Sequence, residues 1–222
     1  MSKKGPRERF VYVLDYLRNG NPVDKHQWHK NKPLVQVVGQ DFFILMEAIP
    51  LREPFQIEEK IDRDKDPPRI KVDVLIEYDD LTSVAKDTLN RVIAKIVEEK
   101  EKEFVAFFNK AEPLTLKLHT LELLPDIGKK TLRVILEQRR ESPFMTYQDI
   151  QNRVGIKDVK EIIIKRILTE MKREDKYYLF VYPTETEQKT QESKQRMQEQ
   201  TQDSKQKQEH IYIGYLDKVK EK

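Results

Sequence analysis

Residues 118–140 constrain the fold more than any other stretch, because two apolar stripes there flank a very short connection. Leu121 and Leu124 form the first stripe. The second recurs at i, i+3 and i+4 spacing and consists of Leu132, Ile135 and Leu136. Residues 125–128, Pro-Asp-Ile-Gly, are too few for anything but a tight bend. The sequence therefore predicts two short helices joined by this bend.

This pattern resembles the helix-hairpin-helix motif, which runs Leu-Pro-Gly-Ile-Gly and holds nucleic-acid backbones. A helix that starts at Gly128 has free backbone N–H groups in its first turn, and the helix dipole adds positive charge there. Glycine also lets a phosphate oxygen come close, because it has no Cβ. The candidate phosphate contacts are Ile127, Gly128, Lys129, Lys130 and Arg133. Such a site binds phosphate and ignores the base. The alternative is a compact helical corner without a ligand.

Asp126 departs from the motif, because it stands where the first glycine is usual. Aspartate tolerates the left-handed backbone conformation better than most residues, so the bend can still form. Its carboxylate would lie near the bound phosphate, and repulsion at about 6 Å amounts to roughly 0.7 kcal/mol in water. We therefore expect a weaker phosphate site than the motif usually provides.

A second, degenerate hairpin is predicted over residues 147–172. Thr146 and Asp149 have the spacing of a capping box that starts its first helix. An amphipathic helix follows a bend at residues 154–158. Gly155 and Lys157 in this bend are weaker candidates for phosphate contact. Two hairpins together can bury apolar faces that one pair of short helices leaves exposed.

The charge distribution supports a polyanionic partner near the first hairpin. The whole chain has a net charge of only +3, but residues 117–173 carry 13 Lys and Arg against 8 Asp and Glu. The chain has no cysteine, which excludes disulfides, thiolate metal sites and a cysteine nucleophile. No run of about 18 apolar residues occurs. We expect a soluble, cytoplasmic protein that binds no membrane.

Residues 9–80 contain five short apolar or alternating runs without helical patterns between them. These runs cover residues 9–17, 34–38, 42–49, 55–60 and 69–78. Their number and spacing predict a small β-barrel, with an OB-like barrel as first choice and an SH3-like barrel as second. Alternation in the first run places Tyr12 and Tyr16 on the same side of its strand.

A barrel of the OB type binds nucleic acid on an exposed sheet face through aromatic stacking and basic side chains. The candidates for these roles are Tyr12, Tyr16, Trp28, Phe42, Arg69 and Lys71. Phe42 is better explained as a core residue. Trp28 lies in a polar loop among His and Lys, where either a core or a stacking role is open.

The sequence thus predicts an α+β protein with a small OB-like barrel, a long connecting helix and a C-terminal tandem helix-hairpin-helix domain. The connecting segment is 81–110, with its helix over 84–109, and the hairpin domain is 111–182, with a terminal strand over 176–182. Residues 1–8 are predicted to form a flexible arm. Residues 183–210 are rich in Gln, Lys and Glu and predict a disordered linker. The short segment 211–222 completes a tail that is the candidate site for a protein partner.

Four segments together resemble one known family: GPRERFVYVLDYL at 5–17, YDDLTSVAKDTL at 78–89, the stretch 107–130 that ends in LLPDIGKK, and KYYLFV at 176–181. The chain is similar over about residues 5–182 to an archaeal family of unassigned function. Its members are described as predicted nucleic-acid-binding proteins that join an OB-like barrel to a helix-hairpin-helix domain. The resemblance implies binding of RNA or DNA, and a role near translation or ribosome maturation.

Three other functions compete with nucleic-acid binding. A DNA glycosylase/lyase would use Lys130 as its catalytic lysine and Asp149 as its acid, but the surrounding helical barrel and four-cysteine cluster are missing. A metal could bind His26 and His29 with Asp24, although a surface loop is the favoured interpretation. A protein adaptor would use the hairpins as scaffold only. We therefore predict a non-enzymatic protein with no catalytic residues, no metal and no cofactor.

Overall fold

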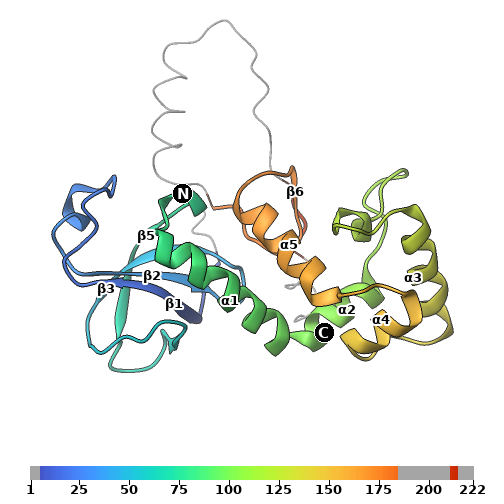
Figure 1. Ribbon diagram of the computed structural model, residues 1–222, viewed down its shortest axis with the longest axis horizontal. Helices are drawn as coiled ribbons and strands as arrows, with labels where there is room; N and C mark the ends of the chain where they lie inside the picture. The colour runs from blue at the N-terminus through green and yellow to red at the C-terminus, as the bar shows by residue number, and fades with distance from the viewer. Residues whose placement is uncertain (1–5, 185–210, 215–222) are drawn as a thin grey trace, which may run out of the picture. The chain divides into compact units, whose positions relative to one another are not determined.

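The computed structural model describes residues 6–184 and 211–214, and the chain forms two compact units (Figure 1). Among the described residues, unit 1 comprises 6–89, 181–184 and 211–212, and unit 2 comprises 90–180 and 213–214. Most of the predicted arm, of the predicted disordered linker and of the C-terminal segment lies outside the described residues. The fold is a mixed α+β arrangement.

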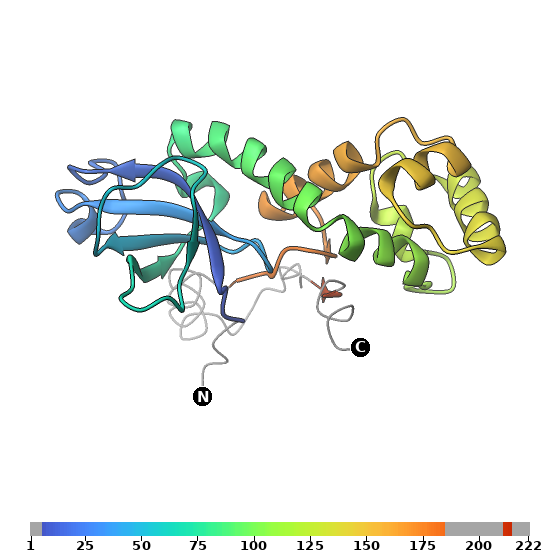
Figure 2. The same cartoon turned by 90° about the horizontal axis from the view of Figure 1, so that it is seen from below.

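Unit 1 is built on an antiparallel five-stranded sheet in the order β4-β1-β2-β3-β5. Its strands are β1 (Phe10–Leu17), β2 (Leu34–Gly39), β3 (Leu45–Pro50), β4 (Lys60–Asp62) and β5 (Ile70–Leu75). Figure 2 shows these blue and teal strands side by side. Among the described residues, no ladder joins the edge strands β4 and β5, so the sheet is open and the predicted barrel closure is not confirmed.

A β-bulge in β1 changes which side chains face the main core. Val13 pairs with Val37 and Asp15 pairs with Gln36, so Leu14 is an extra residue. An extra residue moves every later side chain of the strand to the other face. Tyr16 accordingly packs against the cluster that contains Val13, and the prediction that Tyr16 shares a face with Tyr12 is wrong.

Apolar side chains from all five strands form the core of unit 1: Val11, Val13, Val35, Val37, Ile44, Met46, Ala48, Ile61 and Ile70. Phe42 is half-buried against this cluster, in agreement with the core role favoured from the sequence. Thr82 fastens the start of the following helix to the sheet. Its backbone N–H donates to Gln36 Oε1 at 2.9 Å, and its hydroxyl donates to Asp15 Oδ2 at 2.6 Å.

The strand predicted over 55–60 is not formed, and β4 starts only at its last residue. Glu58 has a φ of 65°, which lies in the left-handed region and interrupts an extended chain. The regular ladder with β1 begins at Lys60, which lies opposite Tyr12, although the Glu58 N–H already donates to the Val13 carbonyl at 2.8 Å.

The predicted long helix is two helices, α1 (Ser83–Glu99) and α2 (Glu101–Lys110). Lys100 separates them with a φ of −102° and a ψ of 25°. Its side chain is buried, and its ammonium lies 3.3 Å from Glu103 Oε2. The residues around the break are Glu and Lys without Gly or Pro, so helix propensity alone does not locate it. α1 passes from unit 1 into unit 2 after Leu89.

In unit 2, a helix follows each of the two predicted bends, but the element before the first bend is a four-residue 3-10 helix rather than the predicted α-helix. The 3-10 helix η3 (Thr120–Leu123) precedes α3 (Lys129–Glu141), and α4 (Tyr147–Val154) precedes α5 (Val159–Met171). The predicted terminal strand is reduced to β6 (Tyr177–Tyr178). Unit 1 also contains β7 (Ile211–Tyr212) and the 3-10 helices η1 (Gln27–His29) and η2 (Tyr78–Asp80). No helix of the described residues has the length and apolar content needed to cross a membrane.

Phe104, Phe107 and Phe180 form an aromatic cluster in unit 2, with the two phenylalanines of α2 each 5.2 Å from the Phe180 ring. A buried ion pair orders the segment that follows α5. Arg166 Nε donates to Glu170 Oε1 at 2.6 Å, and the two side chains are 3 % and 0 % exposed. The Glu170 carboxylate also accepts the N–H groups of Leu179 and Phe180, which joins α5 to the segment that follows it.

Candidate functional site

The predicted phosphate site begins with a tight bend in unit 2. Asp126 has a φ of 64°, so it adopts the left-handed conformation in which the sequence motif usually has glycine. Ile127 is 4 % exposed, and its N–H donates to the Leu124 carbonyl at 3.3 Å. The bend is therefore held by one buried side chain and one hydrogen bond, while Asp126 remains exposed.

The N-terminus of α3 is open toward solvent. Gly128 is its N-cap residue, and no side chain caps this end. A Cβ added at Gly128 would meet nothing within 4 Å. In the described part of the chain, the backbone N–H groups of residues 128–131 have no hydrogen-bond acceptor. Four donors and the positive end of the helix dipole thus point into accessible space.

The three predicted cations lie on the first turns of α3 but differ in their partners. Lys129 Nζ is 2.8 Å from Glu122 and donates to the Lys117 carbonyl at 2.9 Å. Arg133 Nε forms a 2.8 Å pair with Glu137. Lys130 is exposed and has no recorded partner within the described ranges. Both ion pairs have exposed cations, so each contributes little energy and can be exchanged for a stronger anion.

The second hairpin has a different helix start. Gly155 ends α4 in the left-handed conformation with a φ of 79°. Asp158 caps α5, and its carboxylate accepts the Glu161 N–H at 3.0 Å. The Lys157 side chain is exposed. An aspartate at the N-cap uses one backbone donor and repels phosphate, so this bend is a poor anion site.

The predicted stacking residues of unit 1 do not form one surface. Tyr12 is completely buried and cannot stack a base. The Arg69 guanidinium bonds to Glu59 and to the Pro54 carbonyl, and it lies 4.9 Å from the centroid of the Phe55 ring. Lys71 is exposed. Trp28 is 50 % exposed, but its indole N–H donates to Asp73 at 2.9 Å. A base-binding face made from these four residues is therefore not formed.

Asp149 is a capping residue. Its N–H donates to Thr146 Oγ1 at 3.0 Å, and its carboxylate accepts the Met145 N–H at 3.0 Å. It also pairs with Arg153 at 3.2 Å. The Lys130 ammonium is exposed, whereas a lyase lysine needs a desolvated pocket that lowers its pKa. The two residues therefore lack the environment of a lyase site.

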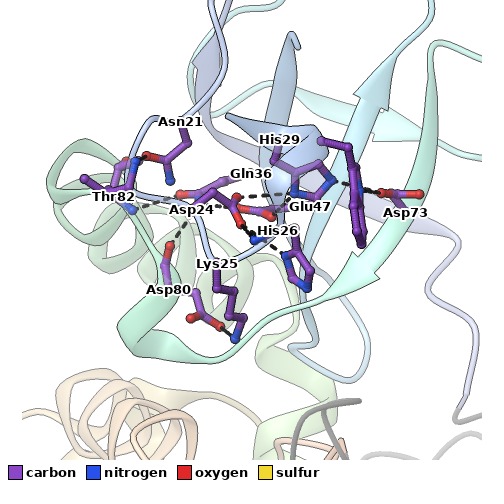
Figure 3. Close-up of polar contacts among 12 residues, drawn as sticks. Asn21, Asp24, Lys25, His26, His29, Gln36, Glu47, Asp73, Asp80 and Thr82 are labelled. Carbon is purple, nitrogen blue, oxygen red and sulfur yellow. Dashed lines mark hydrogen bonds and ion pairs between the residues drawn. The ribbon is translucent and has the colours of Figure 1, made fainter. Parts of the chain in front are cut away.

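A second concentration of functional side chains lies in unit 1 (Figure 3). The side chains of Asp24, His26, His29 and Glu47 each place a nitrogen or oxygen donor within 4.8 Å of the others. His29 is 3 % exposed, so the sequence interpretation of this segment as a simple surface loop is wrong for His29. Figure 3 shows the imidazole of His29 between the side chains of Glu47 and Asp73.

Local turn chemistry positions the loop residues of this cluster. Gly20 has a φ of 80°, and its own backbone packs against the carbonyl groups of His29 and Lys30. Asn21 N–H donates to the His29 carbonyl at 2.9 Å and closes the loop. Asp24 Oδ1 then accepts the His26 N–H at 2.7 Å, which is the short-range turn that aspartate favours.

The sheet supplies the other two acids. Glu47 on β3 lies opposite Gln36 on β2, whose amide N–H donates to Glu47 Oε1 at 2.9 Å. This bond leaves Oε2 facing His29 Nδ1 at 2.8 Å. In β5, Val72 and Val74 pair with consecutive residues of β3, so Asp73 is the extra residue of a β-bulge. The bulge directs Asp73 to His29 Nε2 at 2.9 Å.

Burial and mutual repulsion set the ionisation of this cluster. Burial raises the pKa of the Glu47 carboxyl to about 7. Burial also acts on Asp24, but hydrogen bonds, led by that of the His26 N–H, hold its pKa below the usual value. For the His29 imidazole, burial lowers the pKa, but the surrounding carboxylates outweigh it and the pKa lies above its ordinary value. The pocket thus favours positive charge among its acids.

The family is decided by a match over most of the chain. Residues 7–182 match the family described as "Protein of unknown function (DUF655)". The chain belongs to the DUF655 family. The match includes the hairpin, the loop with His26 and His29, and both sheet acids.

The chain is similar to two archaeal proteins in particular. An uncharacterised protein of Methanocaldococcus jannaschii is 41 % identical over 180 residues, which cover 78 % of this chain and 80 % of that protein. A crystal structure of the Archaeoglobus fulgidus protein Af1531, which carries the DUF655 label, is 38 % identical with a TM-score of 0.68. The structural match covers 79 % of this chain and 100 % of the Af1531 chain.

Proposed function

We propose that this protein is a non-enzymatic nucleic-acid-binding protein that holds the phosphate backbone of RNA or DNA at the N-terminus of α3. In this proposal, η3 and α3 act as a helix-hairpin-helix, and the open sheet of unit 1 is an OB-like module. The observation that carries the proposal is the uncapped, exposed start of α3 beside Lys129, Lys130 and Arg133. Backbone donors, dipole and cations together favour a phosphate and provide no base recognition.

Comparison with the next two helices supports this assignment. α4 is capped by the Thr146 hydroxyl and α5 by the Asp158 carboxylate, whereas α3 starts at Gly128 without a side-chain cap. An N-cap side chain normally stabilises a helix by about 1 kcal/mol. The missing cap, together with the open space at Gly128, fits a helix end that receives its acceptor from a ligand.

The salt dependence of nucleic-acid binding tests the role of the three cations at the start of α3. The variant Lys129→Gln/Lys130→Gln/Arg133→Gln should bind a labelled duplex more weakly, because it lacks three phosphate-neutralising groups. For wild type, about three to five phosphate contacts give a slope of log K against log[salt] of roughly −3 to −4.5 on a duplex. The variant's slope should be flatter by about 2.7. Fluorescence anisotropy with RNA and DNA duplexes over a salt series measures both quantities.

A matched control separates local contact from overall charge. Lys102, Lys110 and Lys172 are also exposed residues of unit 2, and their triple change to Gln removes the same charge. This control should keep most of the slope, and circular dichroism should show both variants folded. Equal slopes for the two triple variants would overturn the proposed site. Absence of salt-dependent binding in wild type would favour the adaptor function.

Substitution of Asp126 should change the nucleic-acid affinity in the opposite direction, by raising it. Asp126→Asn removes a negative charge beside the proposed phosphate and keeps a side chain that tolerates a positive φ. The relief of roughly 0.7 kcal/mol in water corresponds to about a three-fold gain in affinity. Asp126→Gly should give a similar gain. Unchanged affinity in both variants would show that phosphate does not approach this bend.

A further inference from the structure

We propose that Asp24, His26, His29 and Glu47 form a binding site for a divalent first-row transition ion of the zinc type, which fastens the 18–32 loop to the sheet of unit 1. Two imidazoles and two carboxylates are an ordinary ligand set for zinc. Four protein ligands leave no open coordination position, so the role proposed is structural rather than catalytic.

The donor atoms already have the spacing of a coordination shell. His29 Nδ1 lies 3.2 Å from Asp24 Oδ2 and 2.8 Å from Glu47 Oε2, and His26 Nδ1 lies 3.1 Å from Asp24 Oδ1. Tetrahedral ligands at ordinary zinc distances are about 3.3–3.6 Å apart. All four donors fall within 4.8 Å of one another, a span that a single ion can bridge.

Two carboxylates of the proposed site are buried. The side chains of Asp24 and Glu47 are 4 % and 2 % exposed, and they share one neighbour, His29. Two carboxylates withdrawn from water need compensation by positive charge. The nearby Lys25 cannot supply it, because its ammonium pairs with Asp80 at 2.6 Å. A divalent cation at the centre neutralises both carboxylates at once.

The surrounding contacts match those that orient metal ligands. A metal-bound histidine usually donates its second ring N–H to a carboxylate or carbonyl. His29 Nε2 lies 2.9 Å from Asp73 Oδ2, which leaves Nδ1 for a metal. Glu47 is likewise fixed by Gln36, and Gln36 is held by Thr82 N–H at 2.9 Å. These outer contacts come from Asp73, Gln36 and Thr82, which are not among the four proposed ligands.

The competing arrangement is a protonated His29 held between carboxylates without any metal. Both ring nitrogens of His29 already contact acids, so an imidazolium also satisfies the geometry. The two arrangements differ in one measurable respect. A metal displaces the Nδ1 proton, whereas the ion pair keeps both protons on the ring.

Metal titration of the full chain, prepared without an affinity tag and dialysed against chelator, tests the proposal. Zn²⁺ should bind with one-to-one stoichiometry in calorimetry, and Co²⁺ should give the visible absorption of a four-coordinate site. Trp28 is the sole tryptophan, and its ring lies 5.1 Å from His26 and 5.6 Å from His29. Its fluorescence should therefore change with the same stoichiometry.

Three variants and a control locate the ion. Glu47→Gln and His29→Gln should each weaken zinc binding by at least about 100-fold, because each removes a ligand. Asp73→Asn should weaken binding by about 10- to 100-fold through the outer contact. Asp79→Asn changes an exposed acid outside the ligand set and should leave the affinity unchanged.

Two results would overturn the proposal. One is the absence of stoichiometric zinc or cobalt binding to folded wild type, with nitrogen NMR that shows both His29 ring protons. The other is zinc affinity equal to that of wild type in the isosteric variant Glu47→Gln. Circular dichroism verifies that this variant is folded. If His29→Gln does not fold, Glu47→Gln and Asp73→Asn still decide the outcome.

Discussion

Replacing Arg166 with alanine should lower the free energy of unfolding of unit 2 by about 3–5 kcal/mol, because a buried carboxylate would lose its ionic partner. Arg166 is 3 % exposed and contacts Glu170, Asp175 at 2.6 Å, and the carbonyl of Leu123 at 2.9 Å. It also donates to the Tyr177 carbonyl. Urea unfolding followed by the helical signal in circular dichroism measures the loss.

The Glu170 carboxylate explains why the expected loss is large. Its oxygens accept the N–H groups of Leu179 at 2.7 Å and Phe180 at 2.9 Å. Without Arg166, the buried carboxylate keeps these backbone bonds but loses the charged hydrogen bond from the guanidinium. Lys165→Ala is the matched control, since its ion pair with Glu161 is exposed and should contribute less than about 0.5 kcal/mol. Equal losses in the two variants would contradict the buried-pair argument.

Gly20→Ala should lower the stability of unit 1 by about 2–4 kcal/mol, from left-handed backbone strain together with steric overlap. A Cβ at Gly20 would lie 2.5 Å from the His29 carbonyl oxygen and 2.6 Å from that of Lys30. These are backbone atoms, so the loop itself must move. Denaturant unfolding followed by the fluorescence of Trp28 reports the change.

Gly155→Ala separates the two contributions to that loss. Gly155 has almost the same positive φ, 79° against 80°, but a Cβ there would meet nothing within 4 Å. It should cost only the conformational strain, about 1–2 kcal/mol. A Gly20→Ala loss no greater than that of Gly155→Ala would show that the loop accommodates the overlap.

The sequence predicted elements well where the pattern is local. The helices after the bends at 125–128 and 154–158 lie within a residue or two of their predicted positions. Elements governed by backbone irregularities were missed. The Lys100 break has no Gly or Pro signal, and the extra residue Leu14 appears only when β1 is paired with β2.

The same distinction applies to the two sites. The spacing of Asp24, His26 and His29 is visible in the sequence, because one loop carries all three. Glu47 lies in an apolar run that predicts an ordinary buried strand. The alternating pattern around Asp73 predicts only a position on the polar side of a strand. Glu47 and Asp73 are 18 and 44 residues away from His29 in the sequence. Their contacts with His29 depend on the sheet register, which no local sequence pattern specifies.

The bulge at Asp73 makes strand length, and not only residue identity, a requirement for this cluster. Deleting one residue from β5 would restore regular pairing and turn the acid away from His29, although Asp24, His26, His29 and Glu47 would all still be present. A search of other genomes for equivalent sites must therefore compare the spacing within β5 as strictly as it compares the histidines.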